Sequence, residues 1–156
     1  MIITTITTTS TVFKRTVAAT PTNFALVING GAFDASYLQN DAQDAFIYSA
    51  DEPEKPTRYT LNGTSLSEVS NPDLAWSGIR GADLGSVKPA MQLSRDAEYL
   101  SCSLGLRNLV LCEQLTNPLV NTFLECSNSP GVQIGQGNVD PAHCSVVELE
   151  MADVEY

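Results

Sequence analysis

The chain has 156 residues and a formal net charge of -10 at pH 7, with 18 acidic residues against 8 Lys and Arg. Nucleic acids and anionic membrane surfaces bind basic surfaces, so neither is expected as a partner. The length suits one domain with its own core. Charged residues make up only 17% of the chain and turn-forming residues are plentiful, which favours short strands over a helical bundle.

Residues 1–22 are much richer in threonine than the rest of the chain. One interpretation is an extracellular Ser/Thr-rich linker carrying O-linked sugar, because the segment has too few apolar residues to pack. The other is an N-terminal β-strand, since threonine is β-branched and Ile3 and Ile6 could supply apolar contacts. Either way, residues 23–156 are expected to form a single β-rich domain.

Short apolar runs over residues 24–28, 36–39 and 45–49 predict the first strands, separated by turn-forming or polar residues. Residues 58–67 predict a hairpin with Asn62-Gly63 as its two-residue turn, because both central positions of such a turn need positive φ. Residues 68–95 show few regular signals. Residues 115–124 are the best candidate for a short helix, which Pro118 would break.

Asn62-Gly63-Thr64 is also an N-glycosylation sequon, and a hairpin tip is an exposed place for a sugar. Asn62 is therefore a candidate glycosylation site if the protein passes through a eukaryotic secretory pathway.

All four cysteines lie between residues 99 and 149, at successive separations of 10, 14 and 18 residues. No pair has the close spacing of zinc ligands and the chain has one histidine, so we expect disulfides and no metal or cofactor. Disulfides indicate an oxidising compartment, which predicts a secreted, extracellular or cell-surface protein. The first residues lack the continuous apolar core of a signal peptide, so a secreted form would derive from a longer precursor.

Four cysteines allow three pairings, and hairpin geometry favours one of them. A three-residue loop over residues 106–108 would place Cys102 opposite Cys112, with Asn108 in the left-handed conformation. A two-residue loop over residues 107–108 would instead place Cys102 opposite Glu113. We predict the first register, and hence the disulfides Cys102–Cys112 and Cys126–Cys144.

No residue set in the sequence defines a catalytic centre. His143 is the only histidine and precedes Cys144, which is expected to be oxidised, so a Ser-His-Asp or Cys-His arrangement is not expected. Nucleophile-elbow, phosphate-loop and dinucleotide motifs are missing from the sequence. Two opposed carboxylates could still support glycoside hydrolysis, but 18 acidic residues make such pairs uninformative.

Aromatic side chains are the candidates for stacking on a ligand, and glycan binding predicts several of them on one open face. The candidates are Trp76, Tyr37, Tyr48 and Tyr59. Trp76 is the only tryptophan, and its alternative role is in the core, because a Trp ring contributes a large apolar surface.

Several short motifs resemble the uncharacterised β-rich modules of secreted and surface proteins of filamentous fungi. They are FALVI, YTLNGTSL, LSCSLG and CSVVEL, together with the threonine-rich flank. The resemblance implies a cell-wall-associated or adhesive module, and it supplies no catalytic residues. An immunoglobulin-type domain is disfavoured because Trp76 precedes every cysteine.

We therefore predict an antiparallel β-sandwich of about eight to eleven short strands with two disulfides, or alternatively a β-trefoil or small β-barrel. The predicted function is that of a non-catalytic extracellular module, associated with a cell wall and binding a polysaccharide or other glycan, or acting as an adhesin. The alternatives are a small carbohydrate-active hydrolase with paired carboxylates and a purely structural or effector-like secreted protein.

Overall fold

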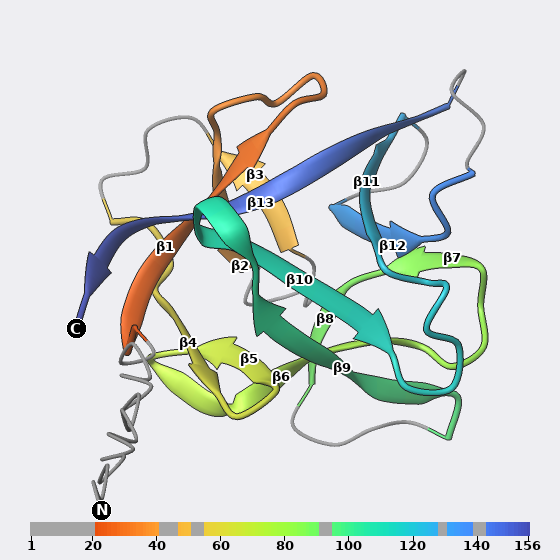
Figure 1. The fold of residues 1–156 in the computed structure, drawn as a ribbon, viewed down its shortest axis with the longest axis horizontal. Coiled ribbons are helices and arrows are strands. Elements are labelled where there is room, and N and C mark those ends of the chain that lie inside the picture. Colours follow the sequence, from red (N-terminus) through yellow and green to blue (C-terminus); the bar gives the residue numbers. More distant parts are fainter. Residues whose placement is uncertain (1–20, 41–46, 51–54, 91–94, 128–130, 139–142) are drawn as a thin grey trace, which may run out of the picture.

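The computed structural model describes residues 21–40, 47–50, 55–90, 95–127, 131–138 and 143–156. These residues form a 13-stranded antiparallel sheet and one short 3-10 helix, which confirms the all-β class (Figure 1). The elements are β1 (Asn23–Asn29), β2 (Tyr37–Asn40), β3 (Ile47–Ala50), β4 (Tyr59–Asn62), β5 (Ser65–Glu68), β6 (Asn71–Ile79), β7 (Leu84–Ser86), β8 (Lys88–Ala90), β9 (Ala97–Leu104), η1 (Leu106–Asn108), β10 (Leu109–Gln114), β11 (Thr122–Cys126), β12 (Val132–Gly135) and β13 (Cys144–Glu155).

The sheet is built around β1 and β13, which pair from Asn23 opposite Glu155 to Asn29 opposite Glu148. The long strand β13 also pairs with β11 at its start and with β10 near its middle (Figure 1). Val147, Leu149 and Met151 are buried and alternate with more exposed residues, which is the period of a half-buried strand.

Strand pairings connect β1, β4, β5, β6, β9, β10 and β13 in that order, and β13 pairs again with β1. The route along these strands therefore closes on itself. From it, β11, β12 and β7 extend on one side and the β2–β3 hairpin on another, while β8 pairs with β6. The two-sheet sandwich stays a prediction, as do its alternatives, the β-trefoil and the small barrel.

The strand count exceeds the expected range because residues 71–90 form β6, β7 and β8. Four consecutive residues of β6, from Ala75 to Gly78, are buried. A strand covered on both faces shows no alternation of apolar and polar residues, so its sequence carried little signal.

The expected helix over residues 115–124 is wrong. Residues 115–121 form a loop and β11 begins at Thr122. Backbone hydrogen bonds from Val120 N–H to the Asn117 carbonyl and from Gln114 N–H to the Val120 carbonyl close the loop, at 3.0 and 3.1 Å. Leu115 and Leu119 are exposed in this loop, Val120 is buried, and Phe123 and Leu124 enter the core from β11. In the part of the chain described, no helix has the length and hydropathy needed to span a membrane.

Both predicted disulfides are confirmed. In the β9–β10 hairpin, η1 is the three-residue loop, and Cys102 pairs directly opposite Cys112. Asn108 has the expected positive φ of 60°, and Arg107 also has a positive φ of 57°. Cys126 and Cys144 likewise face each other across β11 and β13, and in each bridge the two Cα atoms are 4.0 Å apart.

The β4–β5 hairpin forms as expected, but its turn is displaced by one residue. Asn62 pairs with Ser65, so the two loop residues are Gly63 and Thr64 rather than Asn62 and Gly63. Only Gly63 has positive φ, at 62°. Positive φ at the first central position alone is the pattern of a type II′ turn, for which glycine is preferred.

The core has an aromatic centre. Trp76 of β6 makes edge-to-face contacts with Tyr59 of β4, at a centroid distance of 5.6 Å, and with Phe123 of β11, at 6.2 Å. Edge-to-face pairs of this kind place the positive ring edge against the negative ring face. The three rings thus connect β4 and β6, which belong to the closed route of strands, with β11, which belongs to the extension.

Candidate functional site

Trp76 and Tyr59 are not ligand-stacking residues. Trp76 is 1% exposed and Tyr59 is 0% exposed, so protein atoms cover both rings and a sugar could reach neither. The strands carrying them direct both rings into the core, where a large apolar side chain contributes most to stability. The core interpretation of Trp76 is the correct one.

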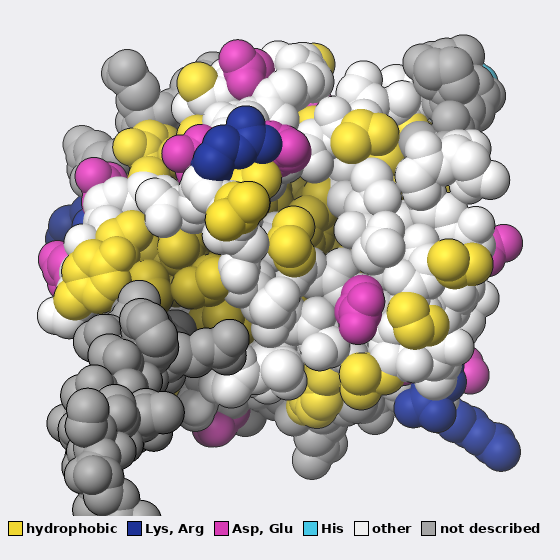
Figure 2. Space-filling model, in the orientation of Figure 1, with side chains coloured by type: hydrophobic (Ala, Val, Ile, Leu, Met, Phe, Trp, Pro, Cys, Tyr) yellow, Lys and Arg dark blue, Asp and Glu magenta, His cyan; other side chains and the backbone are white. Residues whose placement is uncertain are grey.

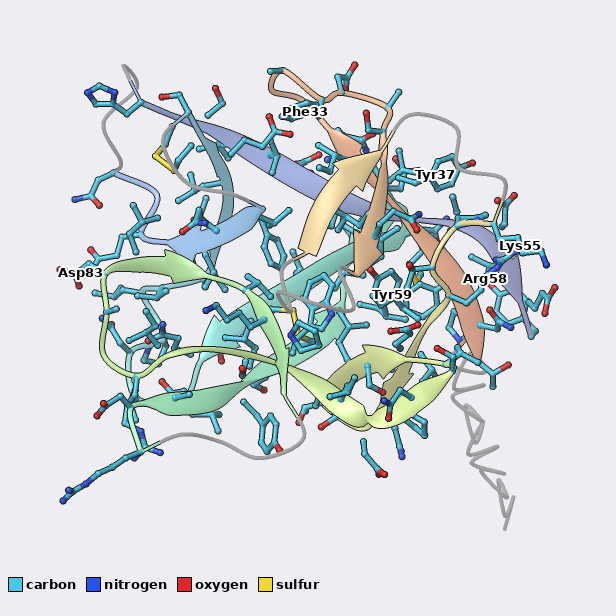
Figure 3. The ribbon with its side chains drawn as sticks, turned by 180° about the vertical axis from the view of Figure 1, so that it is seen from behind. Phe33, Tyr37, Lys55, Arg58, Tyr59 and Asp83 are labelled. Atoms are coloured by element: carbon cyan, nitrogen blue, oxygen red, sulfur yellow. A yellow bond between two sulfur atoms is a disulfide. The ribbon has the colours of Figure 1, made fainter. Side chains whose placement is uncertain are left out.

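The remaining aromatic candidates do not form a platform in the described residues. Tyr37 is half-buried, and the side chain of Tyr48 lies outside the described part of the structure. Phe33 was not among the candidates, although it is 52% exposed in the loop between β1 and β2. Figure 3 shows Phe33 at one end of the molecule, away from Lys55 and Arg58. Its signal in the sequence was its place two residues after the Gly30-Gly31 turn.

A cavity of about 600 Å³ lies where β1 begins, β4 begins and β5 turns into β6. Its volume falls within the range of small-molecule sites, about 300–1,000 Å³. The lining residues come from three separate parts of the chain. They are Asn23, Lys55, Pro56, Thr57, Arg58, Glu68, Val69 and Ser70.

Hydrogen bonds hold two of these parts, the segment before β4 and the β5–β6 turn, in place. The Val69 N–H donates to the Arg58 carbonyl at 2.8 Å, which holds the β5–β6 turn against the start of β4. Arg58 Nη1 donates to the Asp153 carbonyl at 2.6 Å, so the guanidinium is attached to β13. The Thr57 hydroxyl donates to Gln39 Oε1 at 3.1 Å. Because each wall is fixed by a different strand, the cavity is formed by the fold before any ligand binds.

The cavity offers both donors and acceptors. Lys55 and Arg58 are cationic donors, and Figure 3 shows them side by side at the edge of the molecule, with Tyr59 lying deeper. The Glu68 carboxylate accepts a hydrogen bond from the Ser70 hydroxyl. Asn23 Oδ1 is a buried acceptor that has no hydrogen-bond partner among the described residues. The apolar part of the lining comes from Pro56 and Val69.

The groups of the described lining suit recognition of a polar ligand. Hydroxyl groups both donate and accept hydrogen bonds, so they fit a lining that combines the Glu68 acceptor with the Lys55 and Arg58 donors.

Two carboxylates outside the cavity have structural partners. Glu98 is 4% exposed and accepts hydrogen bonds from the Thr116 N–H, at 3.3 Å, and from the Thr116 hydroxyl. Glu125 Oε2 accepts from the Ala32 N–H at 3.0 Å and so fixes the loop that carries Phe33. No group of three or more metal-ligating side chains occurs in the described ranges. These carboxylates therefore hold loops in place.

The other candidate residues lie at the surface. Asn62 is exposed next to the type II′ turn, so the sequon is accessible, and its glycosylation stays a prediction. His143 is exposed, and its carbonyl accepts a hydrogen bond from the Ser127 N–H at 2.8 Å.

One face of the molecule carries apolar surface. Figure 2 shows separate hydrophobic groups and a hollow lined with hydrophobic side chains on this face. Exposed apolar residues such as Leu106, Leu111 and Tyr156 contribute to the apolar surface of the molecule.

Sequence reasoning missed the cavity residues. One signal was present: Lys55 and Arg58 lie three residues apart in a chain with few cations, although Lys55 directly follows Glu54 in an acidic segment. Glu68 directly follows the hairpin predicted over residues 58–67, whereas Asn23 gave no signal, because only the tertiary structure brings it next to that segment. No protein-family model, no curated protein and no solved structure matches this chain, so its function has to be inferred from the cavity itself.

Proposed function

We propose that the protein is a non-catalytic extracellular module that binds a glycan in the cavity between β1, β4 and the β5–β6 turn. The observation that carries the proposal is the lining of this cavity, where cationic donors, a carboxylate and apolar side chains line a space of about 600 Å³. A sugar presents adjacent hydroxyl groups and an apolar ring face, and both kinds of group have counterparts in the lining.

Two features support an extracellular location. Both disulfides connect paired strands, and bridges of this kind persist in oxidising compartments. The exposed sequon at Asn62 would add a sugar at the tip of the β4–β5 hairpin, away from the cavity lining. The resemblance to wall-associated fungal modules agrees with a role at a cell surface.

The test is a glycan-array screen followed by titration calorimetry on the best ligand. In Val69→Trp, a large ring replaces a partly exposed side chain of the lining and would fill the cavity. Val146→Trp is the matched control, because Val146 is an exposed valine on β13 outside the lining. We expect the wild type and Val146→Trp to bind the same glycan and Val69→Trp to lose at least about tenfold in affinity, which equals about 1.4 kcal/mol.

Three outcomes would contradict the proposal. One is binding to no glycan on the array. A second is equal affinity of the wild type and Val69→Trp, which would place the site elsewhere. The third is cleavage of the bound oligosaccharide by the wild type, which mass spectrometry of the incubated ligand would detect and which would make the protein a hydrolase.

A further inference from the structure

The described cavity lining carries more positive than negative charge, whereas the chain as a whole is acidic, and this difference indicates the kind of glycan. The inference rests on the function proposed above. The chain carries a net charge of -10. Among the described residues, however, the cavity lining contains two cations, Lys55 and Arg58, and one carboxylate, Glu68. The described part of the lining thus has one excess positive charge, on a chain that is strongly acidic.

The cavity cations have no carboxylate partner among the described residues. Among the described residues, the ion pair that is found lies outside the cavity and joins Arg107 Nη2 to Glu148 Oε1 at 3.7 Å. For Lys55 and Arg58 no such pair is found in the described ranges. A cation without a counter-charge in a partly enclosed space attracts an anionic ligand more strongly than one in open solvent.

Arg58 is held in a geometry that suits a carboxylate. Its Nη1 atom donates to the Asp153 carbonyl at 2.6 Å, which fixes the side chain and leaves further N–H donors of the guanidinium for a ligand. A planar guanidinium pairs with a carboxylate through two parallel hydrogen bonds. Because the side chain is already ordered, less conformational entropy is lost when the ligand binds.

Glu68 limits the charge that the cavity accepts. Its carboxylate is engaged by the Ser70 hydroxyl and lines the same space as the two cations. It can accept hydrogen bonds from sugar hydroxyls but repels a second anionic group. This favours a ligand with a single carboxylate over sulfated or phosphorylated sugars, which carry a higher charge.

We propose that the ligand is an acidic saccharide containing a uronic acid, a hexose whose C6 is a carboxylate. The carboxylate binds to Arg58 and Lys55, and the sugar hydroxyls bind to Glu68. The uronic acid is either a free monosaccharide or a residue within a chain, and both sources present the same carboxylate and ring hydroxyls.

Matched sugars test the inference directly by titration calorimetry at low ionic strength. The pairs are glucuronate against glucose and galacturonate against galactose, which differ only at C6, each supplied as the monosaccharide and as a trimer. We expect the acidic member of a pair to bind at least about tenfold more tightly, and added salt to weaken only the acidic member. Tighter binding of the trimer would indicate a polymer as the source; equal binding would indicate the free sugar.

Charge variants localise the effect. We expect Arg58→Met to weaken uronate binding by about tenfold or more and Lys55→Met by about threefold, since the Lys55 side chain is exposed. Glu68→Gln keeps an acceptor for sugar hydroxyls but removes the negative charge, so it should increase the ratio of uronate affinity to neutral-sugar affinity within each pair. Arg80→Met removes an exposed cation outside the lining and should change nothing.

Arg58→Lys keeps the positive charge and is the matched control for Arg58→Met. Circular dichroism of each variant checks that the fold is intact. Equal affinity for acidic and neutral sugars, with Val69→Trp abolishing both, would overturn the inference and leave glycan binding standing. Uronate binding that Lys55→Met and Arg58→Met leave unchanged would also overturn it. Binding of neither member of any pair would overturn the inference, and the glycan array then decides separately whether the proposed function stands.

Discussion

Replacing Trp76 by alanine is expected to destabilise the protein severely. The side chain is 1% exposed and contacts the rings of Tyr59 and Phe123 edge-to-face. Truncating a buried aromatic residue to alanine costs about 3–5 kcal/mol. The upper part of that range applies here, because two aromatic contacts are lost with the ring. A domain of this size has a total stability of about 5–15 kcal/mol, so the variant would approach the limit of folding.

Urea denaturation followed by far-UV circular dichroism measures this loss, since the variant has no tryptophan left for fluorescence. Thermal unfolding should show a midpoint lower by about 6–20 °C, at 2–4 °C per kcal/mol for a chain of this length. Tyr156→Ala is the control, because Tyr156 is 82% exposed and its removal should change the stability by less than about 0.5 kcal/mol.

The result that would refute the reasoning is a Trp76→Ala variant that loses less than about 1 kcal/mol. Such a variant, if it also lost glycan binding, would restore Trp76 as a ligand-stacking residue. We expect the opposite for the milder Trp76→Phe: a stability loss smaller than that of alanine, and unchanged glycan affinity, because Trp76 does not line the cavity.

Three further changes test other parts of the fold. Replacing both cysteines of one bridge by alanine should lower the free energy of unfolding, because the unfolded chain gains loop-closure entropy. The expected loss is about 2.7 kcal/mol for Cys102–Cys112, with its 10-residue separation, and about 3.2 kcal/mol for Cys126–Cys144, with its 18-residue separation, measured by urea denaturation under non-reducing conditions. Gly135→Ala should lower the free energy of unfolding by about 1–3 kcal/mol, because the added Cβ would lie 3.0 Å from the Asp83 carbonyl oxygen. Gly137→Ala is the control and should cost little, because its nearest contact is at 3.4 Å. Equal losses of stability in thermal unfolding would contradict this expectation. Thr116→Val should cost about 1–3 kcal/mol in the same assay by removing a donor from the buried Glu98 carboxylate, whereas an unchanged midpoint would show that this contact contributes nothing.

The cavity could not be predicted from the sequence, for a physical reason. Arg58 and Glu68 lie ten residues apart at the open end of the β4–β5 hairpin, but Asn23 precedes Arg58 by 35 residues, and only the pairing of β1 with β4 brings it next to them. Strand pairings between distant segments depend on packing of the whole core, which no local preference encodes. The aromatic hypothesis failed for the same reason, because residue type alone does not determine whether a ring points into the core or to the surface.

Local chemistry, by contrast, determined much of this protein. The Cys102–Cys112 pairing followed from counting outward from a three-residue loop, because a hairpin register depends only on its turn and its two strands. The alternation in β13 likewise identified a half-buried strand. Only the tertiary structure decided that residues 71–79 form a covered strand, that residues 115–121 form a loop, and that Lys55 and Arg58 line a cavity on an acidic protein. Those outcomes depend on which surfaces the remaining strands bury, and burial is a property of the whole fold.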